Sequence, residues 1–148
     1  MKYDDASWHT GGNFPGDLAL DAACTHTGLY LAWAVLAGLG SKELQHDFKG
    51  EFVKLGARSI SPCHVYRAMD GKLTEEELSD EGNAFTKVYF DFEAGQYLED
   101  YEQVLCGSLP TMYHVADSWE SYERLKPILD SRLAAWRAGG VESRGPFV

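Results

Sequence analysis

The sequence has few cysteines, few basic residues and no apolar stretch typical of a membrane span. Its three cysteines form no Cys-x-x-Cys pair, which argues against a disulfide framework or a cysteine-bound metal, so we expect reduced thiols that pack as small apolar groups. The 13 Lys and Arg are outnumbered by 23 Asp and Glu, which gives a formal net charge of −10. Nucleic acids and anionic membranes repel such a chain, so neither is an expected partner.

Motifs for catalysis and nucleotide binding are also missing. The chain contains no Gly-x-Ser-x-Gly nucleophile motif and no glycine loop of the kind that holds phosphates. None of the five histidines forms a His-x-x-x-His or His-Glu-x-x-His pair. From the residues we therefore expect no catalytic residue, no metal and no cofactor. The acidic start of the chain does not resemble a secretory signal, which favours a cytoplasmic protein.

Hydrophobic periodicity predicts an all-α fold. Residues 25–39 are apolar on every helical face, which is typical of a helix surrounded by protein. A second helix is expected to begin after Ser41 and to run to Gly56. Further helices are expected within 62–71, 81–93, 97–106 and 118–139, which makes about six. Within the helix expected at 81–93, residues 86–92 are compatible with either helix or strand.

Local signals refine these elements. Thr74 and Glu77 have the spacing of a capping box, and Asp117 with Glu120 predicts another helix start. Pro127 predicts a kink or break in the last helix, because proline removes a donor and clashes with the preceding turn. The expected result is one compact helical bundle over residues 1–148, with an irregular arm at 1–16 and a flexible tail at 141–148.

Charge is concentrated in one segment. Residues 70–102 contain eleven acids and only two lysines, so this segment accounts for −9 of the net charge. One interpretation is a solvated helix surface; the other is a docking surface for a basic protein, with tyrosines as apolar anchors. The candidate partner-binding residues are Glu75, Glu76, Glu77, Asp80, Glu81, Asp91, Glu93, Tyr97, Glu99, Asp100, Tyr101 and Glu102.

The N-terminal segment suggests a second candidate site. If the arm folds over the first long helix, several hydrogen-bonding side chains can line a pocket. These residues are Asp4, Asp5, Trp8, His9, His26, Tyr30 and Trp33. The same residues also have a structural interpretation. Asp4 or Asp5 caps a helix or turn, Trp8 packs the arm against the core, and His9 bonds a backbone carbonyl. The sequence alone leaves both interpretations open.

Several short motifs carry a resemblance to a known family. They are KYDDASWH at 2–9, GGNFP at 11–15, THTG at 25–28, LAWA at 31–34, DGKL at 70–73, EGNAF at 81–85, LEDY at 98–101, YHV at 113–115 and PILD at 127–130. Together they resemble short bacterial proteins that share a domain of unknown function. The resemblance implies no catalytic residues. Small acidic proteins of this kind are similar to immunity proteins, which neutralise toxins in competition between bacteria.

The leading functional hypothesis is therefore an immunity-type binding protein whose acidic segment covers a basic toxin. It requires no catalysis, because charge complementarity alone speeds the capture of a target. The alternative is a small enzyme or a metal- or ligand-binding domain that uses the N-terminal pocket. A homo-oligomer held together by aromatic stripes is a third interpretation, and the sequence does not fix the oligomeric state.

Overall fold

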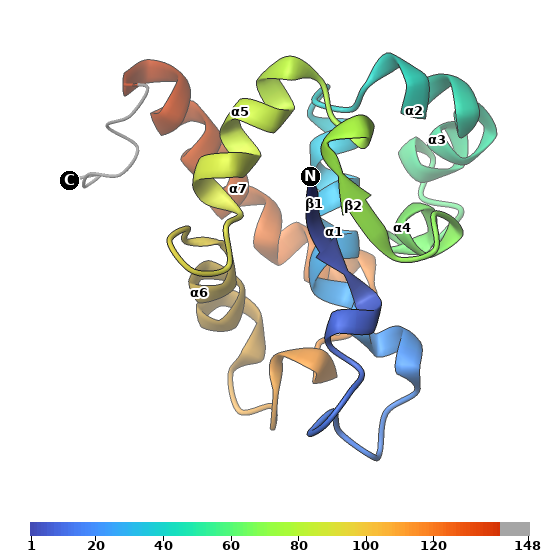
Figure 1. Cartoon of the computed structure of the whole chain (residues 1–148), viewed down its shortest axis with the longest axis vertical. Helices are drawn as coiled ribbons and strands as arrows, with labels where there is room; N and C mark the ends of the chain where they lie inside the picture. The colour runs from blue at the N-terminus through green and yellow to red at the C-terminus, as the bar shows by residue number, and fades with distance from the viewer. Residues whose placement is uncertain (140–148) are drawn as a thin grey trace.

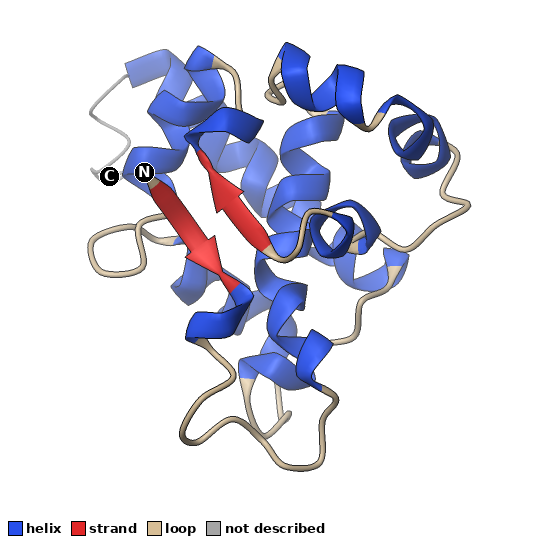
Figure 2. Ribbon diagram, turned by 45° about the vertical axis from the view of Figure 1, so that its right-hand side comes forward, coloured by secondary structure: helices blue, strands red, loops and turns tan. Residues whose placement is uncertain are grey.

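The computed structural model describes residues 1–139, which form helices around a central helix, with a two-stranded sheet at one side (Figures 1 and 2). This architecture confirms the predicted all-α class. In chain order the elements are β1 (Lys2–Asp5), η1 (Ala6–Trp8), η2 (Leu20–Cys24), α1 (Thr25–Leu36), α2 (Lys42–Asp47), α3 (Lys49–Gly56), α4 (His64–Ala68), β2 (Lys72–Thr74), η3 (Glu75–Glu77), α5 (Asp80–Tyr89), α6 (Tyr97–Tyr101), η4 (Glu102–Cys106), η5 (Met112–His114) and α7 (Trp119–Gly139).

Helix α1 is the centre of the core, as its all-round apolar pattern predicts. Ten consecutive residues, from Thr25 to Ala34, are buried. Gly28 lets α4 approach closely, because a Cβ at this position would lie 2.6 Å from Cys63 Sγ. Cys24 and Cys63 are buried free thiols, as expected, and Cys106 is a half-buried one. Within residues 1–139, no helix combines the length and apolar character needed to cross a membrane.

The N-terminal arm contains a strand that the sequence did not reveal. β1 pairs antiparallel with β2, with Lys2 opposite Thr74 and Asp5 opposite Lys72. Beyond the strand, the backbone N–H of Ala6 donates to the carbonyl of Gly71 at 2.8 Å. Gly71 has a φ of +67°, which favours glycine, and an added Cβ would lie 2.9 Å from that of Ala6. The arm is therefore held by backbone bonds to a distant segment, which local sequence patterns do not predict.

The expectation of one helix from Ser41 to Gly56 is wrong, although its start is confirmed. The Ser41 hydroxyl accepts from the N–H of Leu44, as an N-cap should. The helix is then interrupted at Phe48, where φ is −118° and ψ is 33°. The two halves pack on different neighbours, α2 against η3 and α3 against α1, and this tertiary packing divides the apolar stripe.

The predicted capping box forms, and α5 resolves the choice between helix and strand. Thr74 and Glu77 cap each other, but around the 3₁₀ turn η3 instead of an α-helix. Ser79 caps α5 by accepting from the N–H of Gly82. The helix continues through Tyr89, so residues 86–89 are helical and none of 86–92 lies in a strand.

Two expectations for the last helix are corrected. Ser118 caps α7, whereas Asp117 accepts from the N–H of Cys63 at 3.0 Å and pairs with Arg67 at 2.8 Å. Asp117 therefore ties α7 to α4, a role that its spacing to Glu120 does not reveal. The helix also runs unbroken from Trp119 to Gly139 through Pro127, which is exposed, so the expected break is absent. The predicted tail, 141–148, lies outside the described residues.

Candidate functional site

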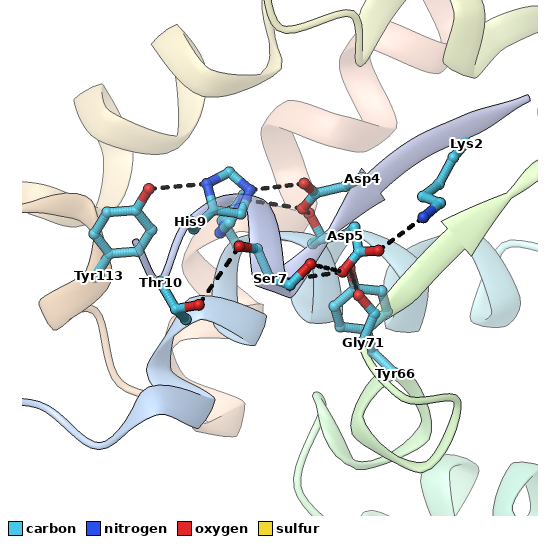
Figure 3. A network of polar contacts seen from close by, with 11 residues as sticks. Lys2, Asp4, Asp5, Ser7, His9, Thr10, Tyr66, Gly71 and Tyr113 are labelled. Atoms are coloured by element: carbon cyan, nitrogen blue, oxygen red, sulfur yellow. Dashed lines mark hydrogen bonds and ion pairs between the residues drawn. The ribbon is translucent and has the colours of Figure 1, made fainter. Parts of the chain in front are cut away.

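The arm turns back on itself immediately after β1. Asp5 caps the short η1 turn, because its carboxylate accepts from the N–H of Ser7 at 3.0 Å and from the Ser7 hydroxyl at 2.8 Å. Lys2 donates to the other carboxylate oxygen at 2.8 Å. This turn brings His9 back over Asp4, and Figure 3 shows the His9 ring between Asp4 and Tyr113.

Asp4, His9 and His26 converge at the start of α1. Asp4 Oδ1 lies 2.7 Å from His9 Nε2, and Asp4 Oδ2 lies 3.2 Å from His26 Nε2. The two imidazole rings meet edge to face, with centroids 4.6 Å apart. Each of the three residues offers one donor atom, and these atoms lie within 4.8 Å of one another. The three side chains therefore form one polar cluster.

Burial and hydrogen bonding act in opposite directions on Asp4. Its side chain is completely buried, and burial alone raises the pKa of a carboxyl group. Contacts with the two imidazoles and with the Thr27 hydroxyl outweigh this effect and hold the Asp4 pKa well below its ordinary value. Burial lowers the pKa of His26, despite the nearby carboxylate. The cluster thus combines a carboxylate with a neutral His26 imidazole.

His26 is the least satisfied member of the cluster. Its side chain is 1% exposed, and neither ring nitrogen has a hydrogen-bond partner among the described residues. Nε2 lies 3.2 Å from Asp4 Oδ2, which is within ion-pair distance but is not a hydrogen bond. The backbone of His26 is nevertheless fixed, because the buried Tyr97 hydroxyl donates to its carbonyl. A buried polar atom without a partner is unusual in a folded protein, and a bound water, a bound ion, strain or a functional role can each account for one.

A second layer of groups orients the cluster. The Thr27 hydroxyl donates to Asp4 Oδ2 at 2.5 Å, and the Tyr113 hydroxyl lies 2.9 Å from His9 Nδ1. Burial, followed by the charge of Asp4, raises the pKa of Tyr113, so its hydroxyl stays protonated at neutral pH. Both outer groups can therefore hydrogen-bond the atoms that define the site.

The remaining residues of the predicted pocket lie elsewhere. Asp5 is occupied as the cap of η1, and Trp8 is 54% exposed under the Lys2 ammonium, so it does not staple the arm. Tyr30 bonds Thr86 in the core, and the Trp33 indole donates to Asp130 on α7. The structure thus joins only three of the seven predicted residues. Because Asp4 and His26 expose almost no surface, the cluster lies in the interior and their donor atoms do not face solvent.

A family model for a domain of unknown function, DUF7832, matches residues 2–115. The chain belongs to this family. The matched part contains Asp4, His9, His26, Thr27 and Tyr113, whereas α7 lies beyond it. No curated protein and no solved structure matches the chain.

The acidic segment of this DUF7832 chain is only partly at the surface. Tyr97, Asp100 and Tyr101 are at most 2% exposed, so their expected place on a docking surface is wrong. They occupy positions i, i+3 and i+4, the spacing of a buried helix face. Asp100 accepts a bidentate pair from Arg132 at 2.9 Å and a hydrogen bond from Tyr89. Asp100 therefore ties α6 to α7, whereas Tyr97 and Tyr101 pack in the core.

The other acids divide into those with partners and those without. Glu75 pairs with Lys87, Glu77 completes the capping box and Glu81 pairs with Arg137. The remaining candidates have exposed side chains with no ion pair in the part of the chain that the structure describes. They are Glu76, Asp80, Asp91, Glu93, Glu99 and Glu102.

The analysis of the sequence missed Thr27 and Tyr113. Tyr113 approaches His9 across 104 residues, a separation for which no local pattern exists. Thr27 lies in THTG and Tyr113 in YHV, two of the motifs that carry the family resemblance. Their presence in these motifs was the signal in the sequence that could have identified them.

Proposed function

We propose that the chain is a protein-binding domain of the immunity type, which recognises a basic partner through an acidic surface made by Asp91, Glu93, Glu99 and Glu102. These four exposed carboxylates lie within twelve residues of chain, on α6, on η4 and in the loop before them. None has an ion pair within residues 1–139. This uncompensated charge is the observation that supports the proposal.

The distribution of charge over the fold also supports it. Residues 42–67, which include α2, α3 and α4, contain five bases and three acids. Two of these bases, Arg58 and Arg67, pair with Glu123 and Asp117, so this range is close to neutral. Figure 1 shows α6 at the lower left and α2 and α3 at the upper right, so the unpaired negative charge is separated from this neutral range. Such a separation orients a charged partner before contact and raises the association rate.

The acidic surface needs an apolar contact in place of the buried tyrosines. Val88 is 46% exposed on α5 and precedes Asp91 by one helical turn. An exposed aliphatic side chain beside unpaired acids is compatible with a small apolar centre and a charged rim. The partner that this surface fits is a basic protein. For an immunity-type protein, that partner is a toxin, and the acidic surface covers it.

The proposal is tested by reversing charge on the acidic surface. The variant Glu99→Lys/Glu102→Lys should capture at least about 10-fold less of a basic partner from cells that encode the chain. Glu43→Lys/Asp47→Lys is the matched control, because it makes the same charge change at exposed, unpaired positions on α2. Quantitative mass spectrometry of the captured proteins, with low-salt and high-salt washes, gives the comparison.

The immunity-type function makes a further requirement of the captured protein. Its production in a test cell should stop growth, and co-production of the wild-type chain or the α2 control should restore growth. The α6/η4 variant should not restore it. Equal capture and equal protection by all three chains would show that the acidic surface does not bind the partner.

The N-terminal cluster favours a second candidate function, the binding of an ion. The convergence of Asp4, His9 and His26 supports it independently of surface charge.

A further inference from the structure

We propose that Asp4, His9 and His26 form a binding site for a divalent late transition metal, with Zn²⁺ as the representative ion. Two imidazole nitrogens and one carboxylate oxygen are a common donor set for Zn²⁺ at sites that leave a fourth position to an external ligand. Two nitrogen donors disfavour Mg²⁺ and Ca²⁺, which prefer oxygen. This proposal concerns the interior of the arm, and it does not depend on the acidic surface.

The distances within the cluster are close to those that a metal requires. Around a tetrahedral ion with bonds of about 2.0–2.2 Å, neighbouring donor atoms lie roughly 3.3–3.6 Å apart. Asp4 Oδ2 and His26 Nε2 are 3.2 Å apart, and Asp4 Oδ1 and His9 Nε2 are 2.7 Å apart. These two distances run to different oxygens of Asp4, and one donor atom from each of the three residues lies within 4.8 Å of the others. Binding through a single carboxylate oxygen therefore requires small side-chain shifts toward a common point. His9 is the most exposed of the three and follows a short turn, so it is the residue best placed to move.

The unpartnered imidazole of His26 is an independent observation that indicates a ligand. Its two ring nitrogens are buried and have no hydrogen bond within the described residues. A buried donor or acceptor without a partner destabilises the folded state. A metal coordinated by Nε2 would satisfy the nitrogen that faces Asp4.

The charge of the cluster also suits a cation. Asp4 is a fully buried carboxylate, and its hydrogen-bond and ion-pair partners are imidazoles and a hydroxyl; within residues 1–139 it has no ion pair with a lysine or arginine. Burial of a carboxylate is costly unless a cation or several donors compensate it. A divalent ion supplies that compensation at the position where the two histidines already converge.

Metal binding requires one rearrangement of protons on His9. In the described geometry, Nε2 faces the Asp4 carboxylate and therefore carries a proton, while Nδ1 accepts from the Tyr113 hydroxyl. When Nε2 binds the metal, the ring proton must lie on Nδ1. The Tyr113 hydroxyl oxygen then accepts a hydrogen bond from this N–H group. A phenol oxygen can act as donor or acceptor, so Tyr113 allows both states.

Thr27 and Tyr113 would then serve as outer partners of the metal ligands. Thr27 already fixes one oxygen of Asp4, and Tyr113 already fixes the outer nitrogen of His9. Hydrogen bonds of this type orient ligands and strengthen their donor character. The inner and outer groups come from β1, from the end of η1, from α1 and from η5, so a bound metal would join the arm to the core.

Titration of the purified full-length chain, freed of metal with a chelator, tests the proposal. Co²⁺ is the first probe, because its visible absorption is intense in tetrahedral nitrogen and oxygen coordination and weak in the hydrated ion. We expect saturation at one equivalent, displacement of Co²⁺ by one equivalent of Zn²⁺ and an increase in Tm with Zn²⁺. Addition of Mg²⁺ instead of Co²⁺ or Zn²⁺ should leave both the visible spectrum and the Tm of the metal-free protein unchanged.

Three variants locate the ion. His9→Gln removes one ligand at a partly exposed position where glutamine can still hydrogen-bond, and it should weaken Zn²⁺ binding at least about 100-fold. His114→Gln is the matched control, because His114 also pairs with a carboxylate, Asp17, at 3.0 Å but lacks a second imidazole. It should bind Zn²⁺ as the wild type does. Tyr113→Phe should weaken binding about 10-fold through the outer hydrogen bond.

The outcomes are decisive in either direction. Absence of saturable binding by the folded wild-type chain, or equal affinity of the wild type and a folded His9→Gln variant, would overturn the proposal. Circular dichroism establishes that each variant is folded. If His9→Gln does not fold, Asp4→Asn provides the same test. Loss of binding in the His114 variant but not in the His9 variant would assign the ion to the surface and contradict the site proposed here.

Discussion

Gly28 on α1 provides a sharp test of how tightly the core around the site is packed. A Cβ at this position would lie 2.6 Å from Cys63 Sγ, 2.7 Å from its Cβ and 3.1 Å from its Cα. Comfortable contacts between such atoms are about 3.5–4.0 Å, so Gly28→Ala requires α1 and α4 to separate by about 1 Å. The neighbour is partly backbone, and a side-chain rotation cannot remove the clash.

The expected magnitude follows from two opposing terms. Overpacking a core costs typically about 1–3 kcal/mol, and this contact lies at the upper end because backbone atoms are involved. Replacing glycine by alanine in a helix returns up to about 1 kcal/mol. The net expectation is a loss of about 2 kcal/mol in the free energy of unfolding. For a chain of this size, that loss lowers Tm by roughly 4–8 °C.

Gly50→Ala is the matched control for this prediction. Gly50 is also helical, on α3, but nothing lies within 4 Å of its added Cβ, so this substitution should stabilise the protein by about 0.5–1 kcal/mol. Urea unfolding followed by circular dichroism, with unchanged m-values, measures both variants. A Gly28→Ala protein as stable as Gly50→Ala would refute the close packing of α1 on α4.

Two further predictions concern charged contacts of α7 and its start. Arg132→Met should lower the free energy of unfolding by about 3–5 kcal/mol, because it removes the bidentate partner of the buried Asp100. Arg137→Met breaks an exposed ion pair and should lower it by about 1 kcal/mol or less. Equal losses for the two variants in urea unfolding would contradict this difference. Burial would raise the pKa of Asp117, but its hydrogen bonds, including those from Arg67, outweigh burial and lower it. This carboxylate therefore stabilises the fold above the ordinary pKa of about 4 and loses that contribution as pH falls below it. The stability difference between wild type and Asp117→Asn should shrink from pH 5 to pH 3, and a constant difference would count against the assignment.

Much of the helical framework was predictable because its signals are local. The all-round apolar pattern of residues 25–39 predicted the buried α1, and Ser41, Thr74 and Glu77 predicted caps that the structure confirms. Capping and amphipathic periodicity depend on residues three or four positions apart. The expected membership of a family of unknown function agrees with the family model that matches residues 2–115.

Errors arose where a residue had two local interpretations. Asp117 has the spacing of an N-cap, but a partner on α4 holds it instead. Tyr97, Asp100 and Tyr101 were counted with the surface acids because of the charge of their segment. Their i, i+3, i+4 spacing was the better guide, since a helix buries one face irrespective of the charge on the others.

The sequence by itself determined the helical class, the central helix, the family and the position of the negative charge. The tertiary structure alone decided which of those charges stay unpaired and which residues meet at the arm. Asp4 and His26 come together because β1 pairs with β2 across the start of α1, and Tyr113 reaches His9 from 104 residues away. Contacts of this kind depend on chain closure and on the packing of whole elements, and therefore leave no periodic trace in the sequence.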